Sequence, residues 1–412
     1  MTELRTGLRE LGGTRPYPDG TPSAERDGRM RRWGGYGLLA LLAYVPLLLT
    51  QPGKVAADTK TYLYLDPGRL LSQAPSMWDP NIGFGTVTHQ TIGYLFPMGP
   101  FYWILEQLLG LPAWVSQRLW LGSLLFAAAL GMLFLFRVLE VRGPGVVAGA
   151  LAFMLTPYVL DYSARISVIL GPWAALPWMV GLVVLALRRG GWLYPALFAV
   201  VVQLVGGVNA TALLFALIAP ALWIPYSVWV THETSWRRAW EVVWKIGLLT
   251  LVTSLWWIAG LWAQGSYGLD ILKFTETVQS VSKTSFPSEI MRGLGYWFFY
   301  GQDKIGPWTE SAPDYTQHIW LILVSYAIPT LALLAAATIK WRYRTYFVLV
   351  MLVGVAIAVG ASPYNNPSAV GALFKAFANN SSAGLALRST GRAVPLVVLG
   401  IAVFLACGVN AV

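Results

Sequence analysis

The sequence predicts an all-α integral membrane protein with about ten transmembrane helices. Hydrophobic residues make up 56% of the 412-residue chain and charged residues only 12%. A soluble domain usually carries about 25% charged residues, so this chain has too little charge to cover a water-exposed surface. Long apolar runs recur along the chain, which is the signature of membrane spans. The 20 Trp residues agree with this class, because Trp favours the membrane–water interface.

The apolar runs define the expected spans and divide the chain into two parts. Residues 1–32 are polar and rich in Gly, Pro and Arg. We expect them to form a disordered cytoplasmic tail, because they have too few apolar residues to bury a core. Residues 33–412 form the expected polytopic membrane domain. The expected spans are 33–51, 113–136, 145–160, 168–187, 192–208, 210–230, 246–263, 318–339, 345–361 and 393–411.

The distribution of basic residues predicts the orientation of these spans. With the N-terminus in the cytoplasm, more than half of the 29 Lys and Arg residues fall in the tail and the short inner loops. This is the positive-inside bias of multi-pass proteins of the cell membrane. The three long loops, 52–112, 264–317 and 362–392, then lie outside, so we expect the active face to be extracytoplasmic. The first of them contains two expected interfacial helices, at 59–71, broken by Pro67, and at 99–109.

Charge distribution and the few cysteine and histidine residues argue against several other classes of protein. A net charge of +10 could indicate nucleic-acid binding, but the basic residues are spread over short loops and form no continuous face. A single cysteine, Cys407, allows neither an internal disulfide nor a cysteine metal cluster. The histidines at 89, 232 and 318 are far apart in the sequence, so we expect no metal site. No cofactor is expected, although a divalent cation is compatible with the chemistry considered below.

The first candidate for chemistry is Asp58, directly after the first span in the run Asp58-Thr59-Lys60-Thr61-Tyr62. A carboxylate here lies near the outer interface, at the depth of a lipid phosphate. Lys60 and the hydroxyls of Tyr62 and Tyr64 could help to fix its geometry, and Asp66 is the reserve candidate. Lys60 and Tyr62 are also candidates for binding the sugar or the acceptor. The alternative is a structural role, since Asp is a good N-cap for a helix that begins at Thr59.

The second candidate is an aromatic stretch of the same loop. Trp78 begins a segment rich in Gly and Pro, and His89, Gln90 and Tyr94 follow it. Flat aromatic faces beside amide and imidazole groups suit the binding of a sugar ring or acceptor. Anchoring of the loop at the interface explains the same residues equally well.

The third candidate is a pair of arginines immediately before the last span. Arg388 and Arg392 lie four residues apart on the outer side, where positive charge runs against the overall bias. The guanidinium fork is the best side chain for a phosphate diester, so we expect these residues to bind a donor phosphate. Lys375 is a weaker candidate. The alternative is snorkelling to the interface, which needs no ligand.

Together these stretches resemble the GT-C superfamily of membrane glycosyltransferases. More narrowly, residues 58–67 and 388–392 are similar to the N-terminal membrane region of the actinobacterial α-(1→3)-arabinofuranosyltransferase D family. Other runs support this resemblance, namely Trp78-Asp79-Pro80, Gly83-Phe84-Gly85, Gln90 and residues 94–100.

The resemblance implies a reaction. The donor would be a polyprenyl-phosphate sugar, decaprenyl-phosphoryl arabinose, and the acceptor the arabinan of arabinogalactan and lipoarabinomannan in the cell wall. Transfer would invert the anomeric carbon and form α-(1→3) branches. The superfamily usually places a catalytic Asp or Glu in the first outer loop, which implies Asp58 as general base. Family members are much longer and carry carbohydrate-binding modules after the membrane core, so we expect this chain to be an N-terminal portion.

Three other functions fit parts of the sequence. Another polyprenyl-phosphate-sugar transferase of the same superfamily, such as a mannosyltransferase, fits the residues almost as well. A lipid or solute transporter is the alternative from another class, but transporters tend to carry inverted repeats and polar residues near the midplane. A non-catalytic membrane scaffold would leave the long, aromatic first loop unexplained.

Overall fold

Helices dominate the structure, as the sequence predicts. The computed structural model describes residues 22–58, 61–73, 76–82, 84–87, 91–163 and 165–411, with the side chains of residues 22–32, 62 and 91 left aside. The chain forms two compact units, residues 1–42 and 43–412. Helix α2 (Pro22–Leu49) runs across their boundary. Everything below concerns the second unit unless stated otherwise.

Each of the ten expected spans coincides with an apolar helix or helix pair in the described part of the chain. After α2 these are α7 (Ala113–Val138), α8 and α9 (Gly145–Met154 and Tyr158–Tyr162), α10 (Leu170–Arg189), α11 (Leu193–Val205), α12 (Ala210–Trp229), α13 (Trp236–Tyr267), α17 (Ile319–Thr338), α18 (Arg344–Val359) and α21 (Val394–Ala411). Seven of these segments are long and apolar enough to cross a membrane, whereas 33–49, 193–205 and 344–359 are shorter. The all-α membrane class is therefore confirmed, but the count of ten spans is not.

Two helices extend well beyond the expected spans into charged sequence. Helix α13 begins at Trp236, not at residue 246, because Ser235 caps it and Glu241 pairs with Lys245 one turn later at 2.6 Å. Such i,i+4 pairs stabilise a polar helix surface. Helix α2 begins at Pro22, so residues 22–32, which we expected to be disordered, are helical. Pro at the first helical position fits this start, and the first 21 residues lie outside the described part.

Helix α10 lies at the centre of the bundle. Its most apolar window is 94% buried, which is typical of a helix that is hydrophobic all round. It packs against α7, α11 and α12, while α21 packs against α8, α17 and α18. Trp173 of α10 stacks on Phe153 of α8 with ring centroids 5.3 Å apart. This core fixes the two ends of the bundle at which the loops gather.

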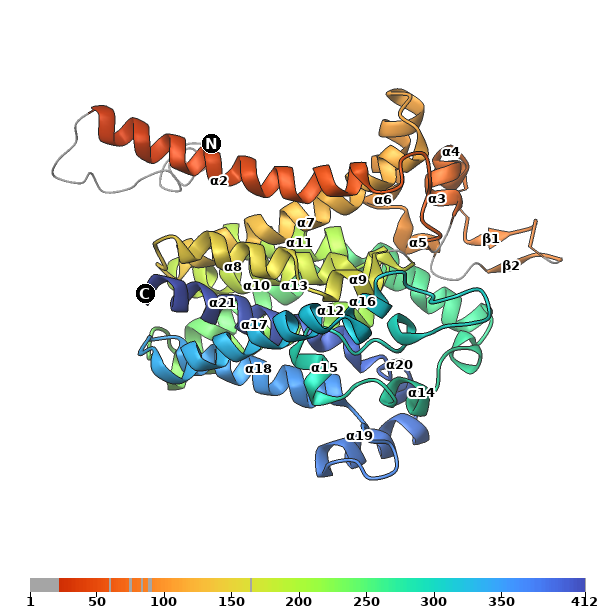
Figure 1. Ribbon diagram of the computed structural model, residues 1–412. Coiled ribbons are helices and arrows are strands. Elements are labelled where there is room, and N and C mark those ends of the chain that lie inside the picture. Colours follow the sequence, from red (N-terminus) through yellow and green to blue (C-terminus); the bar gives the residue numbers. More distant parts are fainter. Residues whose placement is uncertain are drawn as a thin grey trace. The chain divides into compact units, whose positions relative to one another are not determined.

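The long loops fold into short elements: those of the first loop lie on the right of Figure 1, α14 and α20 at the lower right and α19 below the bundle, whereas the C-terminus lies at the left. The first loop holds α3 (Tyr62–Leu65), α4 (Pro67–Ser72), α5 (Thr91–Tyr94), α6 (Met98–Trp103) and η1 (Ile104–Leu108), with β1 (Trp78–Asp79) antiparallel to β2 (Thr86–Val87). The second holds η3 (Ile271–Phe274), α14 (Val278–Ser282), α15 (Pro287–Met291), η4 (Trp297–Tyr300) and α16 (Ala312–Gln317). The third holds α19 (Ala369–Asn380), α20 (Ser382–Ala386) and η5 (Thr390–Ala393). Short helices thus occupy both segments of the first loop where the sequence predicts interfacial helices.

Small residues allow α8 and α21 to approach closely, as is common between membrane helices. A Cβ atom on Gly149 would lie 2.7 Å from the carbonyl oxygen of Ala402 and 2.8 Å from the Ala406 side chain. We predict that Gly149→Ala lowers the free energy of unfolding by about 1–3 kcal/mol, the usual cost of overpacking. Thermal unfolding in detergent measures it. Gly247→Ala in α13 is the control, because its Cβ would meet nothing within 4 Å, and equal Tm values for the two variants would contradict the prediction.

Candidate functional site

Asp58 lies inside the protein at the outer-loop end of the bundle, where it is 9% exposed. Oδ1 accepts a hydrogen bond from the backbone N–H of Ser167 at 3.1 Å, and the Ser167 hydroxyl donates a short hydrogen bond to Oδ2. Ser167 opens η2 (Ser167–Ile169), the turn that leads into α10. The carboxylate is thereby fixed to the most buried helix of the bundle.

The backbone around Asp58 is fixed as well. The side-chain amide of Gln117 in α7 accepts from Ala56 N at 2.8 Å and donates to Ala56 O at 3.0 Å. The Tyr64 hydroxyl contacts the carbonyl oxygens of Ala56 and Asp58 at 3.1 and 3.0 Å. Burial and the charge of Asp58 raise the pKa of the Tyr64 hydroxyl, so it is a neutral donor at physiological pH. The carboxylate therefore has the rigid support that a catalytic group needs.

The reserve acid, Asp66, has a different environment. It is exposed, and its Oδ1 accepts from the backbone N–H of Arg69 at 3.1 Å. This is the N-cap of α4, a structural role that Asp fills well. An N-cap role was the structural alternative for Asp58, but in the structure Asp66 is the residue that caps a helix.

The other first-loop candidates do not gather around one point in the described residues. Trp78 is 53% exposed, and its ring covers Gly85 in the β1–β2 hairpin. Tyr94 is 2% exposed and lies in the interior. Lys60, His89, Gln90 and the side chain of Tyr62 lie outside the described residues.

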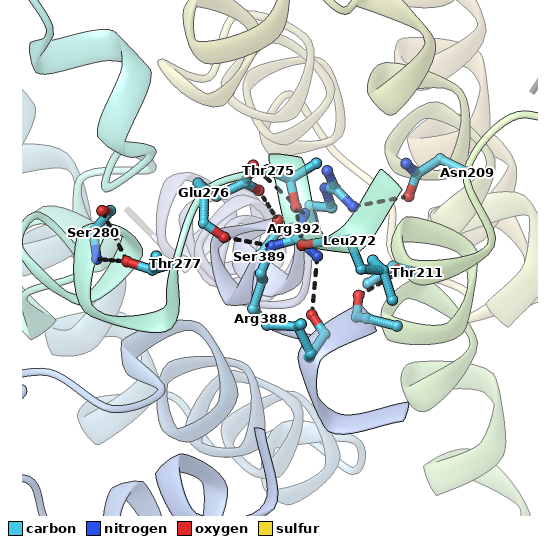
Figure 2. Close-up of polar contacts among 12 residues, drawn as sticks. Asn209, Thr211, Leu272, Thr275, Glu276, Thr277, Ser280, Arg388, Ser389 and Arg392 are labelled. Carbon is cyan, nitrogen blue, oxygen red and sulfur yellow. Dashed lines mark hydrogen bonds and ion pairs between the residues drawn. The ribbon is translucent and has the colours of Figure 1, made fainter. Parts of the chain in front are cut away.

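Arg388 joins the second and third outer loops (Figure 2). Its Nε donates to the carbonyl oxygen of Glu276 at 2.7 Å and one Nη donates to Leu385 O at 2.9 Å. The other Nη donates a short hydrogen bond to the Thr275 hydroxyl and lies 3.5 Å from the Glu276 carboxylate. Ser389 donates to the same carboxylate at 2.6 Å. Arg388 is thus committed to protein partners.

Burial alone would raise the pKa of the Glu276 carboxyl group. The hydrogen bond from Ser389 and the positive charge of Arg388 outweigh burial, and the pKa is lowered below its ordinary value of 4.5. Glu276 therefore stays ionised at neutral pH, and the contact between the two loops is a charged one.

Arg392 is the arginine with spare hydrogen-bonding capacity. One Nη donates to Asn209 Oδ1 at 3.3 Å, and its buried Nε has no partner. Asn209 is itself held, because its Oδ1 also accepts from Ala212 N at 2.9 Å as the N-cap of α12. Lys375 on α19, by contrast, donates to Tyr364 O at 2.7 Å, and its ammonium group lies over the Tyr364 ring.

A small apolar cavity reaches the sequence neighbours of both groups of residues. Val168 and Val208 both line it. Val168 follows Ser167, the hydrogen-bond partner of Asp58, and Val208 precedes Asn209, the hydrogen-bond partner of Arg392. The rest of its wall includes Phe96, Met98, Trp120 and Leu204. Neither Asp58 nor Arg392 lines the cavity, but the residues next to their partners do. Among the described residues, no group of three or more His, Cys, Asp or Glu side chains could hold a metal ion.

The sequence did not predict several of the residues that hold Asp58, Arg388 and Arg392 in place. Ser167, Gln117 and Asn209 are single polar residues at the ends of apolar runs, and they become meaningful only through distant partners. Glu276 carried a weak signal, as one of the acids in the second outer loop. A polar residue at the edge of a membrane span is costly unless it is paired, which is the signal that could have singled them out.

The comparisons with known proteins agree with this architecture. Residues 42–412 match the family model described as Alpha-(1->3)-arabinofuranosyltransferase, N-terminal GT-C domain. The Alpha-(1->3)-arabinofuranosyltransferase of Mycobacterium tuberculosis (strain ATCC 25618 / H37Rv) is 33% identical over 397 residues, which cover 90% of this chain and 26% of that protein. The protein of the same name from Mycolicibacterium smegmatis (strain ATCC 700084 / mc(2)155) is 30% identical over 375 residues, 88% of this chain and 25% of that protein.

A solved structure shows the same fold. The cryo-EM structure of arabinofuranosyltransferase AftD from Mycobacteria superposes with a TM-score of 0.69 at 25% identity, covering 93% of this chain and 24% of that chain. The fold and the comparisons define a membrane domain of the GT-C glycosyltransferase class. The chain belongs to the family of α-(1→3)-arabinofuranosyltransferase N-terminal GT-C domains. It spans about a quarter of the length of these relatives.

The lowered pKa of Glu276 predicts how stability depends on pH. A carboxyl group whose pKa is depressed by folding contributes stability above its unfolded pKa, about 4.5, and loses it as the pH falls through the folded value. We predict that Glu276→Gln lowers the free energy of unfolding at pH 7 by on the order of 3 kcal/mol, because Arg388 loses the buried partner of its charge. The difference from wild type should vanish in acid, as measured by Tm against pH.

Asp270→Asn provides the control in the same loop. Asp270 pairs with Lys273 at 3.2 Å, but both side chains are more than half exposed, and such pairs contribute little. A Tm of Glu276→Gln that equals that of Asp270→Asn at pH 7 would show that the loop contact is not stabilising.

Proposed function

We propose that this chain is the membrane catalytic domain of an inverting arabinofuranosyltransferase. Its donor is decaprenyl-phosphoryl arabinose, and its acceptor is the arabinan of arabinogalactan and lipoarabinomannan, which it extends by α-(1→3) branching. Family membership supports the class of reaction. The observation that carries the site is the buried Asp58 carboxylate, fixed by Ser167 beside the apolar cavity at the outer-loop end.

Asp58 acts as the general base. The acceptor hydroxyl oxygen attacks the anomeric carbon, its proton passes to the Asp58 carboxylate, and the bond from that carbon to the phosphate oxygen breaks. The polyprenyl phosphate leaves with the electron pair and needs no acid. One carboxylate therefore suffices, in contrast to the paired acids of glycoside hydrolysis. Both Asp58 oxygens accept from Ser167, but a carboxylate offers about four lone-pair sites, so acceptor capacity is left.

Arg392 is the proposed ligand of the donor phosphate. It has an unpartnered Nε, whereas Arg388 is committed to the Thr275–Glu276 segment and Lys375 to Tyr364. Arg388 then acts as a positioning residue, which fixes the segment that leads into Arg392. The apolar residues around the small cavity, such as Phe96 and Leu204, are the proposed contact surface for the first isoprene unit of the lipid, because an apolar chain favours an apolar wall.

The active face is proposed to be extracytoplasmic, in a multi-pass protein of the cell membrane. The three long loops fold at one end of the bundle (Figure 1), and the basic residues concentrate in the loops expected at the other end. The positive-inside rule supports a site on the outer side, where a cell-wall polysaccharide is accessible.

The direct test incubates membranes that carry the protein with labelled polyprenyl-phosphate sugars and follows the label into arabinan. We expect arabinose to move, and Asp58→Asn to lower turnover by about 10²–10⁴, the usual contribution of a general base. The fold should persist, because the Asn amide can still accept from Ser167 N and donate to its hydroxyl. Donor binding should also persist.

Asp66→Asn is the matched control. It alters the cap of α4 and should cost at most about 1 kcal/mol of stability with turnover retained. Near-normal turnover of Asp58→Asn together with an inactive Asp66→Asn would assign the base to Asp66. Transfer of mannose in place of arabinose would overturn the proposed donor.

A further inference from the structure

Three buried polar atoms without partners lie on α9 and on η5, the turn that leads into α21. Asp161 is 3% exposed and Tyr158 is fully buried, both on α9. Asp161 Oδ1, the Tyr158 hydroxyl and Arg392 Nε all lack a hydrogen-bond partner. Asp161 also forms no ion pair among the described residues. Buried polar groups in native proteins are almost always satisfied, so three such atoms require an explanation.

These three residues belong to one place in the structure. The ring centroids of Tyr158 and Tyr162 are 5.0 Å apart, and Tyr162 stacks on Tyr296 at 4.5 Å. A Cβ atom on Gly391, the residue before Arg392, would lie 3.8 Å from the Tyr162 hydroxyl, so the turn that carries Arg392 lies against α9. The backbone N–H of Tyr296 occupies the other side of the Asp161 carboxyl group.

The chemistry of this group fits a ring that carries hydroxyl groups. A carboxyl oxygen accepts hydrogen bonds, a guanidinium N–H donates them, and a tyrosine hydroxyl can do both. The stacked Tyr162 and Tyr296 rings add flat apolar surface. Binding sites for small ligands combine such apolar walls with a few convergent polar groups, and a sugar presents both an apolar ring face and hydroxyls.

We propose that Asp161 and Tyr158 bind hydroxyl groups of the donor's arabinofuranosyl unit, next to its phosphate on Arg392. This inference rests on the proposed function, which places the phosphate at Arg392. In the donor the sugar is bonded directly to that phosphate, so a sugar site beside Arg392 is where the ring must lie. The acceptor arabinan offers the same hydroxyl chemistry, and the near-complete burial of Asp161 and Tyr158 favours the smaller, enclosed donor sugar. Asp161 and Tyr158 are positioning and specificity residues in this account, whereas Asp58 takes the proton.

The test compares two lipids on the purified protein in nanodiscs, polyprenyl-phosphoryl arabinofuranose and the bare polyprenyl phosphate. The ratio of their affinities isolates the contribution of the sugar. We expect wild type to bind the sugar-bearing lipid more tightly. Asp161→Asn and Tyr158→Phe should each lower only that affinity, about two- to tenfold, as the loss of a hydrogen bond between neutral groups implies. The affinity for bare polyprenyl phosphate should not change.

Thermal stability distinguishes ligand contacts from structural ones. Tyr158→Phe removes a hydroxyl without a partner, so the Tm of the free protein should stay equal or rise. Tyr346→Phe is the matched control, because this equally buried hydroxyl donates to Ala219 O at 2.8 Å. It should lower the Tm and leave the affinity ratio unchanged.

The outcomes separate the two proposals. If wild type binds neither lipid, the proposed function fails and the sugar site fails with it. If wild type prefers the sugar-bearing lipid and both variants keep that preference, the function stands and the sugar site is wrong. A third ligand, an arabinofuranosyl oligosaccharide, tests binding of the acceptor. If the variants lose binding of this oligosaccharide but keep the wild-type ratio of lipid affinities, Asp161 and Tyr158 bind the acceptor. That result would overturn the donor assignment.

Discussion

Arg388 links the second outer loop to the third, and the outer-loop end of the bundle depends on this link. Its guanidinium group bonds the 275–276 segment of the second loop, while the following Ser389 bonds the Glu276 carboxylate. Arg392, four residues later at the start of the last span, then faces Asn209 at the N-terminus of α12. A charge buried at the edge of a membrane is tolerated when it is paired and hydrogen-bonded. Here that requirement ties two loops to the helix bundle.

The buried charge of Asp58 in the first loop must be hydrogen-bonded for the same reason. Its carboxylate is buried, and the residue that satisfies it, Ser167, begins the central helix of the bundle. Gln117 clamps the backbone two residues before it. Two charged groups of opposite sign are thus held by separate elements, and Val168 and Val208, next to their partners Ser167 and Asn209, line one apolar cavity. This arrangement suits a donor that combines an anionic phosphate, a lipid chain and a sugar.

The sequence predicted the helices well and the site only in part. Apolar runs identify membrane helices because the bilayer demands them locally, so α7, α10, α12 and α21 fall close to the expected ranges. The helix ends were less certain, as the early start of α13 shows, because capping by Ser235 and ion pairs decide them. Asp58, Arg388 and Arg392 stood out as charges beside apolar runs. Their partners could not be predicted, since Glu276 lies 112 positions from Arg388 and Ser167 lies 109 positions from Asp58.

Photo-crosslinking in membranes shows directly where the donor lipid binds, which we propose is the outer-loop end that holds Asp58 and Arg392. A polyprenyl-phosphoryl arabinose with a photoreactive group in its first isoprene unit would be irradiated, and the labelled peptides identified by mass spectrometry. The account predicts labels on the cavity wall, at Phe96–Met98 or Leu204–Val208. The open depression lined by Lys340, Arg342 and Arg344 is the competing basic surface for a phosphate. Labels confined to residues 340–348 would contradict the account.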